Sequence, residues 1–417
     1  MKDRKFRFGA LLFAFLLALS ALGGCGGSPH NTPEPNPGPS PNPQPVGVLE
    51  AWTGTWKSFY GSVSDPSMIS VYTEVQKYYQ EQYSVKGIGS LFETMLRTGF
   101  DGLKVEGSTV TYLDDKGVAQ GSVTYVSRGT QPSGVKEDGK DVLWYLFEAS
   151  SVSDKTGKYK YLVLQEPVKK ADEPLRTSMY YGDKGFDAIF AELKNGSLWG
   201  PAIRPESVPV ASYAEQLKKN VAEFQGWFPA PFALRPEGEK WEGTWKNPIS
   251  FLDDPAMAEA YKTLAEKASA AGKKTNTPEA VKSFFKETML RSDFAGGAKL
   301  EGNAFTFMDD KGGIKATVSY VFDGIDVGNF MGFPISWFVF KAGAEGPYKY
   351  LALRPAGKDS ADGFTHFHMR YGDKSVEALL DPALEKWFPT LCEPTTTAAK
   401  YAASMLEGAD EMVGMLP

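Results

Sequence analysis

Two histidines one residue apart, His366 and His368, are the residues whose type and spacing best suit metal chemistry. They lie in Thr365-His-Phe-His-Met-Arg-Tyr371, a stretch that predicts a strand. Side chains at i and i+2 of a strand project to one face, so Phe367 would point the opposite way. Two neutral imidazoles on one face suit Zn²⁺, which binds His in tetrahedral geometry. The pair is half of such a site, and two histidines on the polar face of a strand remain an alternative.

Histidine and cysteine are scarce, with three His and two Cys among 417 residues. The cysteine count excludes a cysteine-ligated zinc finger, an iron–sulfur cluster and a disulfide scaffold. His30 stands in a proline-rich stretch that does not preorganise ligands, so a histidine-based metal site is confined to His366 and His368. This scarcity favours the metal hypothesis over a chance pair.

Other chemistries find little support in the sequence. It contains no phosphate-binding loop ending in Gly-Lys-Ser/Thr, no His-Glu-x-x-His and no Gly-x-Ser-x-Gly. Gly87-Ile-Gly89 lacks the third glycine of a dinucleotide-binding turn and is predicted to be a loop. Cys392 has no basic sequence neighbours to lower its thiol pKa. No general base accompanies the histidine pair at a recognisable spacing, so we expect a binding protein and not an enzyme.

The charge balance excludes a nucleic-acid partner. The chain has 45 Lys and Arg against 51 Asp and Glu, a net charge of −6, whereas nucleic-acid binding needs a concentrated basic face. Hydrophobic residues make up 42 %, including 27 Phe, 19 Tyr and 9 Trp, which is enough to fill a core.

The N-terminus is predicted to be an export signal. Residues 1–25 have a basic start, an apolar stretch over Phe8–Leu19 and the run Leu22-Gly-Gly-Cys25, which resembles the lipobox of bacterial lipoproteins. A plain secretory signal is the alternative. The resemblance implies a lipid on Cys25 and an extracytoplasmic protein (periplasm or cell surface) that meets a membrane only through this anchor. Gly26 follows in place of the Asp that marks inner-membrane retention, which favours the outer membrane or the cell surface. Residues 26–48 are rich in proline and predict an extended tether.

The rest of the chain is predicted to be two copies of one unit, at 49–232 and 239–417. Matching motifs recur in the same order, with offsets between 189 and 195 residues: Trp52–Lys57 with Trp241–Lys246, Glu93–Arg97 with Glu287–Arg291, Asp114–Gly117 with Asp309–Gly312, Tyr159–Leu162 with Tyr348–Leu351, and Tyr181–Asp183 with Tyr371–Asp373.

Each copy begins with helical pattern and continues with strands. Helices are expected from Pro66 to about Gln82, over Pro255–Ala271 and from Thr277 to about Leu290. Strands are expected at Val105–Tyr112, Val123–Val126, Leu143–Glu148, Tyr159–Leu164, Thr177–Tyr181, Leu300–Phe307, Thr317–Phe322, Trp337–Lys341, Tyr348–Leu353 and Thr365–Tyr371. The Asp-Asp-Lys-Gly runs are interpreted as hairpin turns, with calcium ligation as the costlier alternative. Short strands at this spacing predict an antiparallel barrel with a helical insert.

The second copy resembles the ZinT (YodA) family, a zinc-binding domain of exported bacterial proteins. The resemblance rests on Trp241-Glu-Gly-Thr-Trp245, Tyr348-Lys-Tyr350, Thr365–Asp373 and Lys386-Trp-Phe-Pro-Thr390. It implies a mainly β fold with added helices: two tandem calycin or lipocalin-like barrels, each opening on Gly-Thr-Trp. It also implies that zinc, or another divalent metal, is bound for buffering or for donation to a zinc-importer binding protein.

The ligand set that the resemblance implies is incomplete. The family adds a third His shortly after the Tyr-Lys-Tyr strand, where this chain has Leu353-Arg-Pro-Ala356. Asp359 and Asp362, in the following loop, are the carboxylates best placed to replace it. In the first copy Arg176 and Ser178 occupy the positions of the two histidines, which implies a metal-free unit. The alternative is a degenerate lipocalin-like barrel that binds an apolar ligand or a protein partner without metal.

Overall fold

The computed structural model describes residues 49–79, 82–137, 140–167, 174–194, 199–221, 228, 230–234, 241–330, 333–358 and 363–417. They form two compact units. Unit 1 contains the described residues of Met1–Val75 and Leu91–Trp227, and unit 2 contains those of Gln76–Ser90 and Phe228–Pro417. The predicted bounds of 49–232 and 239–417 stay a prediction. Residues 1–48, with His30 and Cys25, lie outside the described part.

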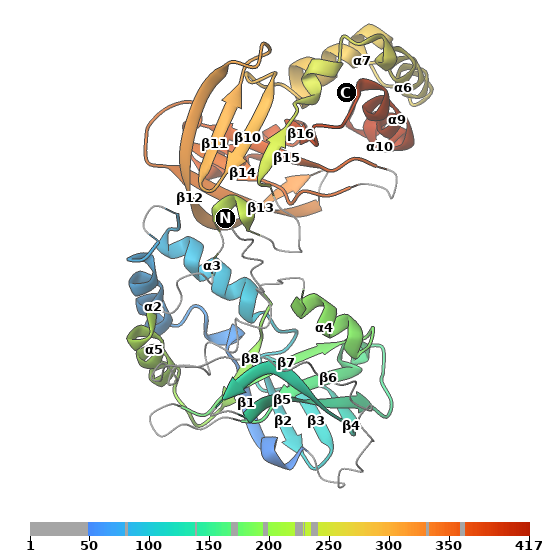
Figure 1. The fold of residues 1–417 in the computed structure, drawn as a ribbon. Coiled ribbons are helices and arrows are strands. Elements are labelled where there is room, and N and C mark those ends of the chain that lie inside the picture. Colours follow the sequence, from blue (N-terminus) through green and yellow to red (C-terminus); the bar gives the residue numbers. More distant parts are fainter. Residues whose placement is uncertain are drawn as a thin grey trace, which may run out of the picture. The chain divides into compact units, whose positions relative to one another are not determined.

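Unit 1 contains a closed antiparallel barrel in which consecutive strands are neighbours (Figure 1). Its strands are β1 (Gly54–Ser58), β2 (Gly102–Glu106), β3 (Thr109–Leu113), β4 (Ala119–Glu137), β5 (Lys140–Ala149), β6 (Tyr161–Gln165), β7 (Thr177–Gly182) and β8 (Ala202–Pro205). Pairing of β1 with β8 closes the barrel, with Trp56 opposite Pro205 and Ser58 opposite Ile203.

The core of this barrel is built from buried side chains contributed by every strand. They include Trp56, Leu103, Tyr112, Tyr125, Phe147, Leu162, Met179 and Ile203, one from each strand in turn. Tyr112 and Tyr159 stack with ring centres 3.8 Å apart, and Trp52 meets Phe147 edge-on at 5.9 Å. The protein's own aromatic side chains therefore pack this core, as the high aromatic content predicts.

Unit 2 contains an eight-stranded antiparallel sheet with the same sequential neighbours. Its strands are β9 (Gly243–Trp245), β10 (Gly297–Glu301), β11 (Ala304–Met308), β12 (Ile314–Phe330), β13 (Phe333–Ala342), β14 (Tyr350–Leu353), β15 (His366–Gly372) and β16 (Thr390–Cys392). Its end strands approach each other at an isolated bridge, where Lys246 and Cys392 exchange N–H···O bonds of 2.8 and 2.9 Å. The strand order is that of an open sheet, so a second closed barrel stays a prediction.

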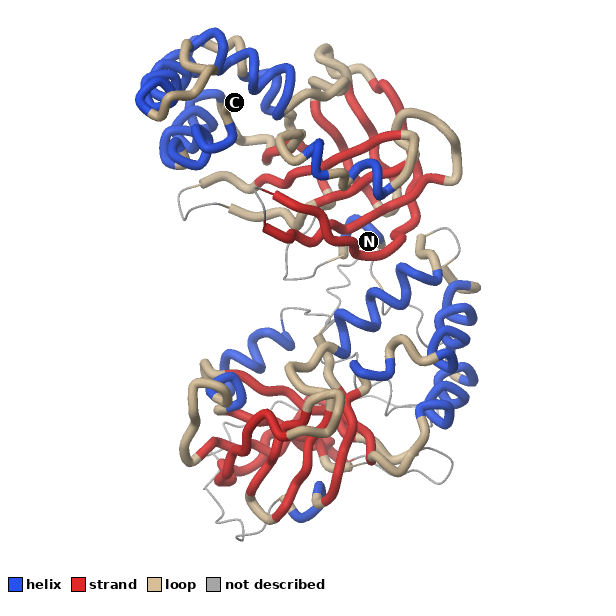
Figure 2. The backbone as a smooth tube through the Cα atoms, turned by 180° about the vertical axis from the view of Figure 1, so that it is seen from behind, coloured by secondary structure: helices blue, strands red, loops and turns tan. Residues whose placement is uncertain are grey.

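Helices add to both halves of the chain. They are α2 (Pro66–Gln76), α3 (Val85–Leu96), α4 (Phe186–Lys194), α5 (Val210–Lys219), α6 (Ala258–Ala270), α7 (Pro278–Phe284), α8 (Val376–Leu379), α9 (Ala398–Glu407) and α10 (Ala409–Met415). In unit 2, α6, α7, α9 and α10 gather beside the sheet, as Figure 2 shows from the opposite side. Within the described residues, no helix combines the length and apolar character needed to cross a membrane.

Local signals explain where several helices begin. The Thr277 side chain accepts from Ala280 N at 3.2 Å, and Pro278 takes the first helical position of α7. In the same way, the Thr397 hydroxyl oxygen accepts from the backbone N–H of Lys400 and caps the start of α9. After α7 the chain makes a π-helical turn, Phe285–Met289, of the kind often found at functional sites.

Equivalent hydrogen bonds recur in the two units. In unit 1 the Trp52 indole donates to the Gln165 carbonyl at 2.9 Å. In unit 2 the Trp241 indole donates to the Arg354 carbonyl at 2.7 Å. The Trp199 indole donates to the Arg97 carbonyl in unit 1, as the Trp387 indole donates to the Arg291 carbonyl in unit 2. Likewise, the Tyr125 hydroxyl donates to the Tyr159 carbonyl and the Tyr320 hydroxyl donates to the Tyr348 carbonyl. These bonds agree with the repeat read from the sequence.

The Asp-Asp-Lys-Gly turns are confirmed. Asp114 Oδ1 accepts from the backbone N–H of Lys116 and Val118 at 2.9 and 2.8 Å. Asp309 Oδ1 accepts from Lys311 and Gly313 at 2.9 and 2.7 Å. A side chain that closes its own turn in this manner explains the motif without a metal.

Several sequence predictions are wrong in detail. The helix expected from Pro66 to about Gln82 ends at Gln76, as α2. Val105–Tyr112 and Leu300–Phe307 are each a two-strand hairpin and not one strand, because Gly107 and Gly302 take positive φ of 58° and 64° at the turns. Gly87-Ile-Gly89 lies inside α3 and not in a loop. The strands predicted at Val123–Val126 and Thr317–Phe322 extend much further, as β4 and β12.

Asp293 is expected to make unit 2 acid-sensitive. Burial alone would raise its pKa, but hydrogen bonds from Lys315, Tyr348 and Tyr371 hold the pKa below its usual 3.8. The stabilisation is therefore present above about pH 4 and is lost as the pH falls through the lower pKa of the folded state. We expect Asp293→Asn to cost about 1 kcal/mol at pH 7 and progressively less as the pH falls below about 4. Urea unfolding of both forms over this pH range measures the difference, and a difference independent of pH would contradict the expectation.

Candidate metal centre

The two histidines lie on β15, between β14 and β16. In the register with β16, His366 is opposite Cys392 and His368 is opposite Thr390. His366 is buried and His368 is half-buried. The intervening Phe367 packs edge-on against Trp245, with ring centres 4.8 Å apart. The predicted strand and the predicted common face are both observed, because the two imidazole rings are 5.1 Å apart and contact the same cavity.

Thr390 determines which nitrogen of His368 carries hydrogen. The Thr390 hydroxyl donates its one hydrogen to the Phe388 carbonyl at 2.9 Å. It must therefore accept at its 2.9 Å contact with His368 Nδ1, so that Nδ1 carries hydrogen. In this tautomer the lone pair of His368 is on Nε2, the arrangement in which imidazole binds a metal.

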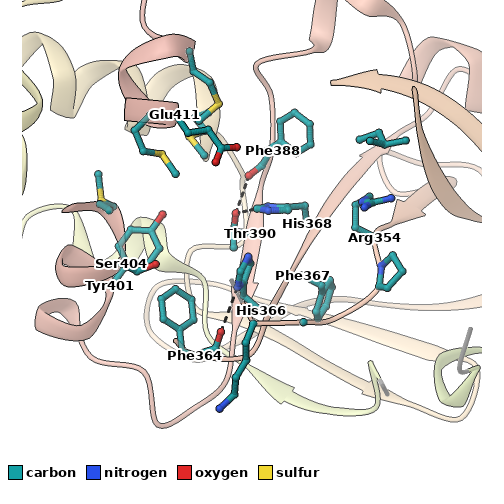
Figure 3. Close-up of a pocket in the computed structure, with 18 residues that line it drawn as sticks. Arg354, Phe364, His366, Phe367, His368, Phe388, Thr390, Tyr401, Ser404 and Glu411 are labelled. Carbon is teal, nitrogen blue, oxygen red and sulfur yellow. Dashed lines mark hydrogen bonds between the residues drawn. The ribbon is translucent and has the colours of Figure 1, made fainter. Parts of the chain in front are cut away.

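His366 is oriented in the same sense. Its Nδ1 faces the Phe364 carbonyl at 3.4 Å, and a carbonyl only accepts, so Nδ1 is again the protonated nitrogen (Figure 3). The Phe364 ring packs against the imidazole with centres 5.3 Å apart. Both histidines are thus held through Nδ1 by oxygen atoms, with their lone pairs on Nε2.

His368 is neutral throughout the ordinary pH range. Burial, followed by the nearby His366 and the Arg354 cation, lowers its pKa to about 3. A neutral imidazole is the form that binds metal, so no proton competes at neutral pH.

A cavity of about 320 Å³ contacts both rings. Its charged neighbours are Arg354, Lys358 and Glu411, and much of the remaining wall is apolar or aromatic. Figure 3 shows Glu411 reaching in from α10, while Arg354 lies on the other side of the histidines. Imidazole, carboxylate and apolar surface therefore line one cavity.

The histidine pair fits zinc, but the described residues do not complete a site. Two imidazoles on one tetrahedral zinc, with Zn–N of about 2.0–2.1 Å, place their ring centres about 5 Å apart. The observed separation of 5.1 Å matches this value. Among the described residues, no group of three His, Cys, Asp or Glu side chains is placed to hold an ion. Asp359 and Asp362, the predicted replacements for the third His, lie outside the described residues.

Sequence reasoning missed three residues at this site. Thr390 orients His368, Glu411 brings a carboxylate from the last helix, and Arg370 organises the chain leading to Thr390. Thr390 is paired with His368 across two strands, and Glu411 is 43 positions away from His368 in the sequence. A helical pattern over Ala398–Met415 could have predicted the C-terminal helices, but no local signal indicates which of their residues face the cavity.

Arg370 is fully buried two residues after His368. Its guanidinium donates to the carbonyls of Trp387, Leu379 and Leu384 at 3.1, 2.9 and 2.8 Å. Burial lowers its pKa to about 10, so it stays charged at neutral pH. It therefore ties the segment that precedes β16 to the strand that carries the histidines.

Unit 1 lacks the histidine pair and its orienting threonine at the equivalent strands. Ser178 pairs with Ala202 as His368 pairs with Thr390, so the gapless alignment of the two copies holds at this strand pair. Arg176, which immediately precedes β7, stands where unit 2 has His366. A charged guanidinium does not ligate a cation, and Ala202 has no hydroxyl to orient a ligand.

Cys392 takes no part in the cavity. It is a buried free thiol whose Sγ lies 3.4 Å from the Lys246 carbonyl, and burial raises its pKa to about 11. Thr396 and Lys246 lower the pKa of the thiol, but burial outweighs them, so the thiol is not activated.

Thr390→Val is expected to weaken zinc binding about 10- to 100-fold by removing the acceptor that orients His368. Thr396→Val is the matched control, since Thr396 is also fully buried but does not line the cavity. Competition with a chromophoric zinc chelator measures both affinities. Equal affinities for the two variants would contradict an orienting role for Thr390.

Comparison with known proteins places a family similarity in the first half of the chain. The zinc(II)-bound ZinT-like domain of Streptococcus pneumoniae AdcA is 17 % identical, with a TM-score of 0.32 over 41 % of this chain and 89 % of that chain. Zinc(II)-bound AdcA from the same organism is 17 % identical, with a TM-score of 0.33 over 41 % and 35 %. A search of curated proteins finds no match. Residues 47–208 match the family described as ZinT (YodA) periplasmic lipocalin-like zinc-recruitment.

Proposed function

We propose that this chain is an extracytoplasmic zinc-binding protein in which His366 and His368 hold the metal. The observation that carries the proposal is the pair of imidazoles 5.1 Å apart, each with Nδ1 directed at an oxygen atom. Both imidazoles also line one cavity, so a single ion there can reach both rings. The match of residues 47–208 to a family described as recruiting zinc lies in unit 1, and it supports the proposal only through the repeat that relates unit 1 to unit 2.

Carboxylates or water complete the site in this proposal. Glu411 is the described carboxylate that lines the cavity, and Asp359 and Asp362 remain predicted ligands. One carboxylate would also offset part of the charge of a buried Zn²⁺. With two histidines in place of three, we expect weaker binding than a complete three-histidine site would give. Such affinity suits a buffer, or a donor that passes zinc to an importer's binding protein, better than a catalyst.

Unit 1 serves a structural or partner-binding role in this proposal. Arg176, Ser178 and Ala202 give it no metal ligand at the equivalent strand pair. The duplication, the export signal and the lipid on Cys25 belong to the same proposal, with the proline-rich tether spacing unit 1 from a membrane. An apolar ligand inside the barrel, the alternative function, would have to displace packed residues such as Trp52, Tyr112 and Tyr159.

The test of this function is the metal content of the full chain, purified without an affinity tag. About one zinc per chain is expected, measured by inductively coupled plasma mass spectrometry, and none in a His366→Ala/His368→Ala form. Metal-free protein that co-purifies with apolar material and fails to take up added zinc would contradict it and would favour the apolar-ligand alternative.

A further inference from the structure

Methionines gather around the cavity that contains the two histidines. Met289, Met405, Met412 and Met415 all line it. Methionine accounts for 12 of the 417 residues, so a wall of 18 residues would contain fewer than one by composition alone. They come from three separate elements, the π-helical turn, α9 and α10, so the cluster is not the apolar stripe of a single helix.

All four methionines line the cavity that the two histidines also line. No Cys is among the lining residues, so every sulfur atom in Figure 3 belongs to a methionine. These atoms lie on the Glu411 side of the cavity, away from Arg354. Met289, Met405 and Met415 are only 3–5 % exposed. These three side chains are therefore largely kept from bulk water, whereas Met412 is half-buried.

The chemistry of this set differs from that of a zinc site. Thioether sulfur is a soft ligand that selects Cu(I), whereas zinc prefers imidazole, thiolate and carboxylate. Imidazoles and thioethers are neutral ligands. The site with its ion therefore carries a net charge of +1 when the ion is monovalent and +2 when it is Zn²⁺. Because the cost of burying charge rises steeply with its magnitude, a neutral set of imidazoles and thioethers favours the monovalent ion.

We propose that this cavity also binds a soft monovalent cation, Cu(I), through His366, His368 and methionine thioethers. The proposal rests on the proposed role of the two histidines as metal ligands, but not on zinc being the metal. The methionines supply what the described His, Cys, Asp and Glu side chains lack, since no three of these are placed to hold an ion. Thioethers also suit an oxidising compartment, where free thiolates are lost to disulfides.

The experiment compares Cu(I) and zinc affinities of the full chain under anaerobic conditions, with a chromophoric chelator for each metal. Met405→Leu/Met412→Leu removes two sulfur atoms with little change of volume, which cores tolerate best. We expect this form to lose at least about tenfold in Cu(I) affinity and to keep its zinc affinity within about twofold. Met257→Leu is the matched control, since Met257 is buried in the same core but does not line the cavity.

The outcomes separate this proposal from the proposed zinc function. Loss of zinc binding in the double histidine variant, with Cu(I) affinity unchanged by the methionine replacements, would overturn the soft-metal proposal alone. Cu(I) binding that depends on histidines and methionines in a chain that never binds zinc would overturn the zinc function alone. Copper-edge X-ray absorption of the unaltered chain gives a readout that needs no variant. Sulfur scattering beside imidazole supports the proposal, and its absence contradicts it.

Discussion

Replacing His366 and His368 together by alanine is expected to lower the zinc affinity of the full chain at least about 100-fold. The two imidazoles have ring centres 5.1 Å apart, line one cavity and each place Nδ1 against an oxygen atom. Without them, only carboxylate oxygen and water would remain, and these would hold the ion weakly. Competition with a chromophoric chelator measures the loss.

Unit 1 provides a control matched in position. Arg176→Ala/Ser178→Ala changes the residues that correspond to the two histidines, where Ser178 pairs with Ala202 as His368 pairs with Thr390. This form is expected to keep the zinc affinity and stoichiometry of the unaltered chain. A comparable loss in both double variants would show that zinc binding follows general damage and not the histidine pair.

Arg370→Leu is expected to destabilise unit 2 by about 3–5 kcal/mol. The guanidinium is fully buried and donates to the carbonyls of Leu379, Leu384 and Trp387. It also lies over the rings of Trp337 and Phe388, with its central carbon 5.0 Å from each ring centre. Leucine would leave three carbonyls without their donor and a gap between the two rings.

Hydrogen exchange is the appropriate measurement for Arg370→Leu, because a two-unit chain need not unfold in one step. Faster exchange is expected in β15 and β16, together with weaker zinc binding, since the segment held by Arg370 leads to Thr390. Arg128→Leu is the control, because its ion pair with Glu148 is exposed and such pairs contribute about 0–1 kcal/mol. Unchanged exchange in β15 would contradict the assigned role of Arg370.

The sequence predicted the strand of the histidines because its signal is local. Alternation places His366 and His368 on one face, and this needs no knowledge of neighbouring strands. The closed barrel of unit 1 was predicted from short strands at regular spacing. The hairpins at Gly107 and Gly302 were missed because the apolar alternation continues across each glycine, whose positive φ is invisible in the pattern.

The rest of the site depends on contacts between distant segments. Thr390 meets His368 through strand register, and Met289 reaches the cavity through a π-helical turn that no periodicity predicts. Glu411, Met412 and Met415 belong to α10, whose position depends on packing against α6 and α9. A single sequence indicates that such residues are helical, but it does not indicate that they and the histidines share a cavity.

The most direct test of the central claim is zinc-edge X-ray absorption of the full chain loaded with one equivalent of zinc. The account predicts two imidazole nitrogens at about 2.0–2.1 Å with oxygen completing the shell, and loss of the imidazole signal in the His366→Ala/His368→Ala form. A zinc shell made only of oxygen, or imidazole scattering that persists in that variant, would contradict it.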